Sequence, residues 1–155
     1  MKVYIDSDGV LADFEGWVRK YDPELLHPVY KTAIKHILEA FKKSEVIDKG
    51  LIEFIKNNKD AYVLTAVPSI EHIDPYNDTD YSSEALQNIF IHNKKSWFES
   101  VGIPLEQVII VTHREDKVKY SNPGALLIDD YEKNCEEWRK HGGTAVHYTR
   151  EKQVG

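Results

Sequence analysis

Residues 3–14 read Val-Tyr-Ile-Asp-Ser-Asp-Gly-Val-Leu-Ala-Asp-Phe. The β-branched and aromatic residues 3–5 predict a buried strand that ends at two carboxylates, Asp6 and Asp8, and Gly9 then favours a turn. Residues two apart on a strand point to the same face, so the two carboxylates can converge. Neighbouring carboxylates repel each other unless a cation lies between them. The stretch therefore indicates a divalent-metal site, an acid–base pair or both. The alternative is a polar turn after a strand, in which Asp and Gly are common.

Length and composition are those of a single globular domain, residues 1–155, with 41% hydrophobic and 30% charged residues. A net charge of -6 disfavours a nonspecific nucleic-acid binder. Cys135 is the only cysteine, which excludes an intrachain disulfide and is typical of a reducing compartment. We find neither a signal-peptide pattern nor a long apolar span, so we expect a cytoplasmic protein with no membrane partner.

Four further apolar runs predict strands that are buried on both faces, as in parallel sheets. These runs are residues 61–65, 107–112, 125–128 and 144–148. Apolar residues at three- and four-residue spacing predict helices over residues 30–43, 45–56, 83–100 and 131–140. Strands that alternate with helices predict an α/β fold, a three-layer Rossmann-like parallel sheet.

Two segments depart from this simple alternation. Residues 15–43 provide more helical sequence than one crossover needs, which predicts a small helical cap inserted after the first strand. Residues 68–82 are rich in Pro, Asn and Asp, which predicts a long polar loop, and loops of that length are often functional.

Polar residues follow the predicted strands at one edge of the sheet, where open α/β sheets bind their ligands. They are Asp6, Asp8, Thr65, Lys117, Asp129 and Asp130. Clustered carboxylate oxygens suit Mg²⁺, which binds through one or two carboxylates and substrate phosphate. A hydroxyl and an ammonium beside the metal suit a phosphoryl group, whose transfer depends on positioning and charge neutralisation. An Asp carboxylate can also attack phosphorus.

Four pieces of the chain, in this order, resemble the haloacid dehalogenase (HAD) superfamily of phosphatases, and within it the 5'(3')-deoxyribonucleotidases. They are residues 6–14, Leu64-Thr65-Ala66, Trp97-Phe98 followed by residues 108–117, and Leu126-Leu127-Ile128-Asp129-Asp130. The first and last pieces are the specific ones. The resemblance implies an Mg²⁺-dependent phosphomonoesterase acting on a small phosphorylated substrate, a (deoxy)nucleoside monophosphate.

The resemblance also implies a role for each residue. Asp6 would be the nucleophile that forms an aspartyl-phosphate, and Asp8 the general acid and then base. Thr65 would bind a phosphate oxygen, and Lys117 would hold the phosphate and the nucleophile together. The metal site would comprise Asp6, the backbone carbonyl of Asp8, and the pair Asp129 and Asp130, of which we prefer Asp130 for direct coordination.

Several of these residues have plainer interpretations. Thr65 is also a common type of strand residue. Lys119 competes with Lys117, because the separation of Lys117 from Asp129 is slightly longer than the family pattern. Asp130 also suits the cap of the following helix. The predicted site would be wrong only if all of these plainer interpretations were correct at the same time.

Substrate choice is less well indicated. The separation of Asp6 from Thr65 implies a smaller cap than in the deoxyribonucleotidases. Aromatic side chains either line a reduced pocket or pack between cap and core; they are Phe14, Trp17, Tyr21 and Tyr30. Ala66 replaces a residue that often carries a hydroxyl in the family, although it still lies at the predicted substrate site. His113 and Arg114 either contact substrate or are simply solvated.

Two other functions remain open from the sequence. A small cap suits a nucleic-acid 3'-phosphatase, but the acidic net charge and the lack of a basic tract make nucleic acid a disfavoured partner. The alternative from another class is a non-catalytic HAD-fold binding module, against which the intact set of Asp6, Asp8 and Lys117 argues. The sequence indicates no oligomeric state.

Overall fold

The computed structural model describes residues 1–23 and 34–150. At its centre is an open sheet of five strands, all parallel, in the order β3-β2-β1-β4-β5. The strands are β1 (Lys2–Ile5), β2 (Ala61–Ala66), β3 (Val108–Val111), β4 (Ala125–Asp129) and β5 (Thr144–His147). Each lies within one or two residues of a predicted strand, so the α/β prediction is confirmed. The strand order is consistent with a Rossmann-like fold.

Helices connect these strands. The α-helices are α1 (Phe14–Val18), α2 (Ile34–Lys43), α3 (Lys49–Asn57), α4 (Ile70–Ile73), α5 (Ser83–Ser100) and α6 (Glu132–Lys140). Short 3₁₀ segments are η2 (Asp74–Tyr76), η3 (Leu105–Gln107) and η4 (Arg114–Tyr120). The helices expected over residues 83–100 and 131–140 are confirmed. The helix expected from residue 45 begins only at Lys49, because the Asp48 side chain accepts a hydrogen bond from the Leu51 N–H and caps it there.

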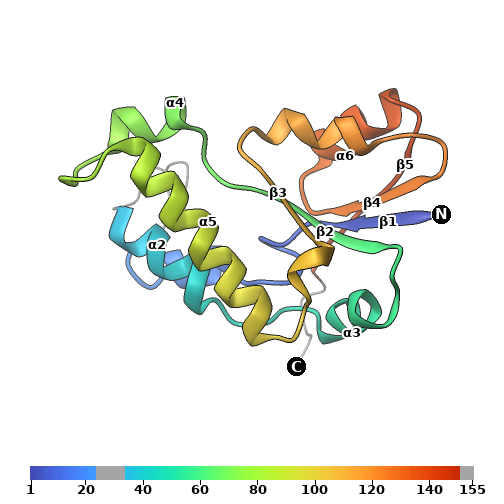
Figure 1. Cartoon of the computed structure of the whole chain (residues 1–155), viewed down its shortest axis with the longest axis horizontal. Coiled ribbons are helices and arrows are strands. Elements are labelled where there is room, and N and C mark those ends of the chain that lie inside the picture. The colour runs from blue at the N-terminus through green and yellow to red at the C-terminus, as the bar shows by residue number, and fades with distance from the viewer. Residues whose placement is uncertain (24–33, 151–155) are drawn as a thin grey trace.

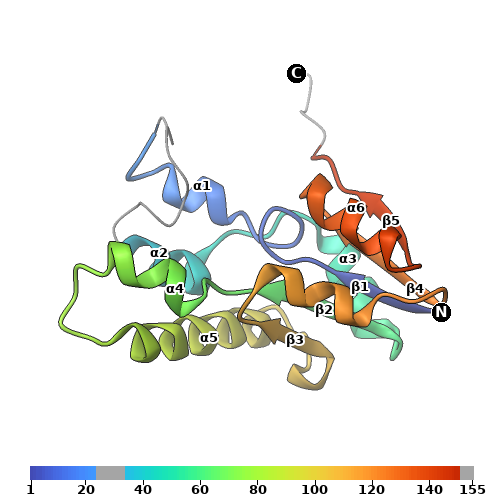
Figure 2. The ribbon, with the colours of Figure 1, turned by 90° about the horizontal axis from the view of Figure 1, so that it is seen from above.

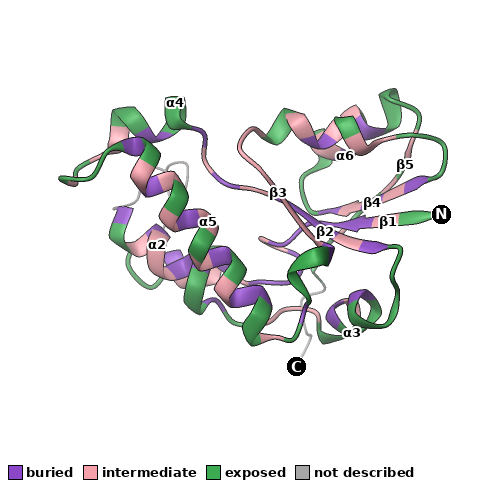
Figure 3. Cartoon of the chain, viewed as in Figure 1, coloured by how far each residue is buried: buried purple, intermediate pink, exposed green. Residues whose placement is uncertain are grey.

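Side chains alternate between the two faces of the sheet, and each face has its own helical cover (Figure 1). Ile5 and Val63 pack towards α3 and the end of α5, where Phe98 is buried. Tyr4 and Leu127 point the other way and pack around Trp138 of α6. Buried residues therefore run along the strands and on the helix faces turned towards them (Figure 3). The helices on both faces leave the carboxyl ends of the strands as the accessible edge.

A helical lobe, formed by α1, α2, α4 and the first half of α5, stands beside that edge (Figure 2). Its core contains a stacked pair, Phe14 and Phe41, with ring centroids 4.8 Å apart, and Phe90 of α5 meets Phe41 edge-on at 5.4 Å. The cap was expected within residues 15–43, of which 24–33 lie outside the described residues. Its described helices share their core with α4 and α5, so segments that follow β2 complete this lobe.

The segment from 68 to 82 is more ordered than the predicted polar loop. Ser69 caps α4 through its hydroxyl, which accepts from the His72 N–H, and Ile73 is buried in the helical lobe. Pro75 lies in the first turn of η2, where its missing N–H is harmless. The loop prediction was therefore wrong over α4 and η2, because one buried apolar residue and one cap organise a sequence with little periodicity. Within the described ranges, no helix combines the length and apolar character needed to cross a membrane.

Candidate functional site

The loop after β1 is shaped by backbone hydrogen bonds. The Asp6 N–H donates to the Ile128 carbonyl of β4 at 2.9 Å, which holds the start of the loop against the neighbouring strand. The Ser7 carbonyl then accepts from the N–H groups of Val10, Leu11 and Ala12. Gly9 has a φ of 85°, and a Cβ there would overlap the Asp130 carboxylate. Only glycine permits this close approach between the β1 loop and the end of β4.

Three carboxylates gather at this point. Asp6, Asp129 and Asp130 each place one oxygen within 4.8 Å of the others. The cause is the sheet register: Ile5 of β1 pairs with Ile128 of β4, so the residues that follow leave the sheet side by side. Connections from β1 and β4 lead to opposite sides, so the cluster lies at the topological switch point where open α/β sheets bind ligands.

Lys117 is the cation of this cluster. Its ammonium lies 3.0 Å from Asp6 Oδ1 and 3.0 Å from Asp129 Oδ2, and its side chain is 4% exposed. The competing Lys119 is 71% exposed and pairs instead with Asp116 at 3.2 Å. The structure therefore brings Lys117, and not Lys119, to the carboxylates.

Charge in the cluster is unbalanced, because one ammonium faces three carboxylates. Burial alone would lower the pKa of Lys117, but Asp6 and Asp129 raise it above its usual range. Burial and the charge of Asp6 raise the pKa of Asp129 to about 6. Burial, the charge of Asp6 and a hydrogen bond shared with Asp6 raise the pKa of Asp130 to about 8. The cluster thus holds more negative charge than its own cation neutralises.

This arrangement fits a divalent cation. Oxygens on opposite sides of an Mg²⁺ ion are about 4.2 Å apart, and the three carboxylate oxygens, all within 4.8 Å of one another, are close enough to share one ion. Asp129 is already engaged, since it accepts from the Tyr131 N–H, from Lys117 and from Asn134. In the described part of the chain, the structure gives the Asp130 carboxylate no hydrogen bond from an N–H group, and the bond to the His147 ring at 2.9 Å involves only the Asp130 backbone carbonyl. Asp130 is therefore the carboxylate most available for direct coordination.

Stability in chelator is expected to fall as the pH rises from about 4 to about 8. The pKa of Asp129 and of Asp130 is raised on folding, so the folded state binds more protons in this range than the unfolded chain. This stabilisation is fully present below the unfolded pKa of 3.8 and is lost as the pH passes about 6 and about 8. A bound cation compensates for the ionised carboxylates, so Mg²⁺ should raise Tm more at high pH.

Differential scanning calorimetry at about pH 5 and about pH 8, with Mg²⁺ and with chelator, measures this effect. For Asp129 alone, the loss of stability between these two pH values amounts to roughly 1–2 kcal/mol, or a fall in Tm of about 5 °C for a chain of this size. Asp130→Asn should flatten the pH dependence. An equal effect of Mg²⁺ at the two pH values would contradict the expectation.

The Asp8 side chain has a different partner from the other three carboxylates. Its carboxylate is not part of the three-carboxylate group and instead lies 2.8 Å from the ammonium of Lys94 on α5. Lys94 is 2% exposed, and it also donates to the Thr65 hydroxyl and, at 3.3 Å, to the Ala66 carbonyl at the end of β2. Asp6 and Asp8 therefore share one loop, but their carboxylates do not meet at one point as expected, because the buried ammonium of Lys94 holds the Asp8 side chain.

Sequence reasoning missed Lys94, although a signal was present. Phe90, Lys94 and Trp97 follow each other at helical spacing on the buried face of α5. A lysine on an apolar stripe is rare, because an unpaired buried charge is costly. Such a residue predicts a buried carboxylate partner, but the pattern does not tell which one.

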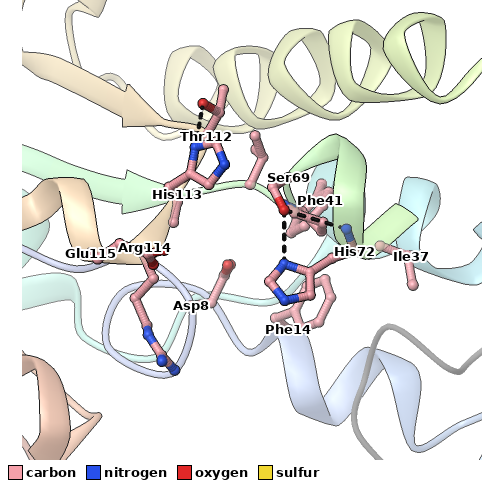
Figure 4. Close-up of a pocket in the computed structure, with 13 residues that line it drawn as sticks. Asp8, Phe14, Ile37, Phe41, Ser69, His72, Thr112, His113, Arg114 and Glu115 are labelled. Carbon is pink, nitrogen blue, oxygen red and sulfur yellow. Dashed lines mark hydrogen bonds between the residues drawn. The ribbon is translucent and has the colours of Figure 1, made fainter. Parts of the chain in front are cut away.

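A pocket of about 440 Å³ opens beside Asp8 (Figure 4). One wall is apolar and comes from the helical lobe, with Phe14, Ile37 and Phe41. The other wall is polar and comes from α4 and the segment after β3; it contains Ser69, His72, Thr112, His113, Arg114 and Glu115. Figure 4 shows Asp8, the His72 ring and Phe14 turned towards the same space. This pocket could take an organic group of small size with one apolar side.

Hydrogen bonds order the polar wall. The Ser69 hydroxyl lies 2.8 Å from Nδ1 of His72. His113 lies 3.2 Å from Glu71, so the segment after β3 is joined to α4 across the rim of the pocket. The Glu71 side chain is exposed. Hydrogen bonds from its own backbone N–H, from Ser69 and from His113 lower the pKa of its carboxyl group. The polar wall therefore comes from α4 with its N-cap and from the segment after β3, two parts of the chain that no sequence motif or periodicity connects.

Only some of the predicted substrate-binding residues line this pocket. Phe14 and Ala66 line the pocket, as do His113 and Arg114. Trp17 and Tyr21 do not; Tyr21 stacks on His36, with ring centroids 3.7 Å apart. Tyr30 lies outside the described residues. Ile37, Phe41, Ser69 and His72 were not predicted, because α2 and α4 reach the pocket only through tertiary packing.

Comparison of the chain with models of protein families found no match, and a search of curated proteins found no significantly similar sequence. The functional argument therefore depends on the geometry and chemistry of the site.

Proposed function

We propose that this protein is an Mg²⁺-dependent phosphomonoesterase of the HAD superfamily that works through an aspartyl-phosphate on Asp6. One observation carries the proposal: Asp6 lies 3.0 Å from the buried ammonium of Lys117, within a cluster of three carboxylates at the end of the sheet. An anionic phosphoryl group approaches a carboxylate only where cations offset its charge, and Lys117 with a metal ion would offset it here.

The first step joins Asp6 to the substrate. A carboxylate oxygen of Asp6 attacks phosphorus, the bond from phosphorus to the ester oxygen breaks, and the leaving oxygen takes a proton from Asp8. In the second step Asp8 takes a proton from water, the water oxygen bonds to phosphorus, and the bond to Asp6 breaks. Asp6 and Asp8 thereby return to their starting forms, and inorganic phosphate is released.

The other residues hold the phosphoryl group. Lys117 binds it and keeps the Asp6 carboxylate aligned, and the buried hydroxyl of Thr65 donates to a phosphate oxygen. Asp6, Asp129, Asp130 and the backbone of Asp8 would hold Mg²⁺. When bound, the ion would neutralise charge on the phosphoryl oxygens.

The substrate is a small phosphate ester whose organic part enters the pocket beside Asp8. A (deoxy)nucleoside monophosphate is the best candidate, because the apolar wall of Phe14 and Phe41 suits a planar base and the opposite wall supplies polar partners. Ligand pockets commonly measure about 300–1,000 Å³, and a volume of about 440 Å³ lies near the small end of that range.

Phosphate release from a panel of substrates tests the proposal. The panel contains deoxy- and ribonucleoside monophosphates, simple aryl phosphates and a 3'-phosphorylated oligonucleotide, each with Mg²⁺ and with chelator. We expect Mg²⁺-dependent turnover of at least one nucleoside monophosphate. Preference for the oligonucleotide would favour a nucleic-acid 3'-phosphatase. No turnover, with Mg²⁺ binding shown by calorimetry, would overturn the enzyme proposal in favour of a binding module.

A further inference from the structure

Lys94 has used all of its hydrogen-bonding capacity. A lysine ammonium has three N–H donors and no acceptor. The structure gives it three oxygen partners: Asp8 Oδ2 at 2.8 Å, the Thr65 hydroxyl, and the Ala66 carbonyl at 3.3 Å. The ammonium also lies 4.9 Å from the centre of the Phe41 ring, which closes its remaining side. Lys94 thus has no donor left for a substrate, and any effect on the reaction must pass through these neighbours.

The contact with Asp8 distinguishes its two oxygens. Oδ2 accepts from Lys94, whereas the structure gives Oδ1 no hydrogen bond within the described residues. The Asp8 side chain is 30% exposed and lies in the wall of the pocket. Oδ1 is therefore the oxygen left to exchange a proton with a group bound there, and the Lys94 contact holds it in that orientation.

The contact with Thr65 selects the direction of its hydroxyl. A hydroxyl has one donor hydrogen and accepts through its lone pairs. Because the Thr65 oxygen accepts from Lys94, its own hydrogen must point to another group. The hydroxyl is buried at the end of β2, beside the pocket wall that begins at Ala66. Lys94 thereby makes Thr65 a donor, which is what a phosphate oxygen requires.

We propose that Lys94 is a positioning residue of this site, which aims the free oxygen of Asp8 at the leaving group and turns the Thr65 hydroxyl into a phosphate donor. The inference rests on the proposed phosphomonoesterase function. A plain structural role is the alternative, since breaking a buried ion pair is destabilising on its own. The two roles differ in one measurable respect. Lost stability lowers activity on all substrates equally, whereas a misplaced acid matters most when the leaving group is poor.

The test compares Lys94→Met with wild-type protein on a series of aryl and alkyl phosphates of graded leaving-group pKa. The quantity is kcat/KM, which covers only the steps up to departure of the leaving group. General acid catalysis typically contributes about 10²–10⁴-fold. We therefore expect a loss of about 10²-fold or more on alkyl phosphates and a much smaller loss on p-nitrophenyl phosphate. Lys95→Met is the matched control, because Lys95 is the exposed neighbour on the same helix; it should behave as wild type.

The Thr65 contact has its own readout. Inhibition by inorganic phosphate should weaken in Thr65→Val and in Lys94→Met. The two effects should combine less than additively in the double variant, because the variants disturb one donor. If Lys94→Met does not fold, Lys94→Gln keeps a polar group of similar length and serves in the same comparison.

The outcomes separate the two proposals. No turnover by wild-type protein would overturn the phosphomonoesterase function, and the inference with it. Wild-type turnover with a uniform loss across the series in the Lys94 variants, or no loss, would overturn the inference alone. A loss that grows with leaving-group pKa supports it.

Discussion

Asp6→Asn should abolish phosphate release, with kcat lowered by about 10⁴-fold or more. An amide oxygen is a far poorer nucleophile than a carboxylate, and removal of a covalent nucleophile commonly costs several orders of magnitude. The change is nearly isosteric, and the Asp6 N–H keeps its bond to the Ile128 carbonyl. The variant should therefore fold. Phosphate release on the best substrate of the panel measures the loss.

Asp13→Asn is the matched control for this variant. Asp13 belongs to the same sequence motif but caps α1, where its side chain accepts from the Gly16 N–H at 3.1 Å. Asn caps helices about as well as Asp, so activity should stay near the wild-type level. Borohydride reduction of quenched wild-type enzyme should convert the aspartyl-phosphate at residue 6 to homoserine, detectable by peptide mass spectrometry. Retention of more than a tenth of wild-type activity by Asp6→Asn would remove Asp6 from the nucleophile's role.

Lys117→Met should lose both activity and stability. The ammonium touches two buried carboxylates, and removing one partner of a buried pair costs about 3–5 kcal/mol, because Asp6 and Asp129 would remain without their cation. That cost corresponds to a fall in Tm of about 10 °C or more for a chain of this size. Lost alignment of the nucleophile and lost phosphate binding should also lower kcat/KM by about 10³-fold.

The loss of stability should depend on pH. Near pH 5, below the raised pKa of about 6, Asp129 takes up a proton and needs its cation less. Denaturant unfolding of Lys117→Met should therefore show a smaller loss at pH 5 than at pH 8. Lys119→Met is the control, since that exposed side chain pairs with Asp116 at the surface; the stability of this variant should differ from that of the wild type by less than about 0.5 kcal/mol. Equal losses in the two variants would contradict the assignment of Lys117.

The sheet and its reactive edge follow from local sequence. Short, mostly apolar runs of three to six residues located each of the five strands in the described part of the chain, because strands buried on both faces carry that pattern wherever they pair. Parallel strands direct their carboxyl ends to one edge, so Asp6, Thr65 and Asp129 could be placed together without knowledge of any contact. Gly9 signalled a turn, although its close approach to the Asp130 carboxylate is visible only in three dimensions.

The sequence by itself thus determined the α/β sheet, the edge that carries the carboxylates and the residues at each strand end. Tertiary structure decided three further points: which lysine lies against the carboxylate cluster, which cation holds Asp8, and which helices and loops line the pocket. The reason is physical. Periodicity encodes how a residue lies within its own element, whereas the partner of a buried charge depends on which elements pack against it. Lys94 and Asp8 belong to a helix and a loop far apart in the chain, and only their packing brings the two charges within 2.8 Å.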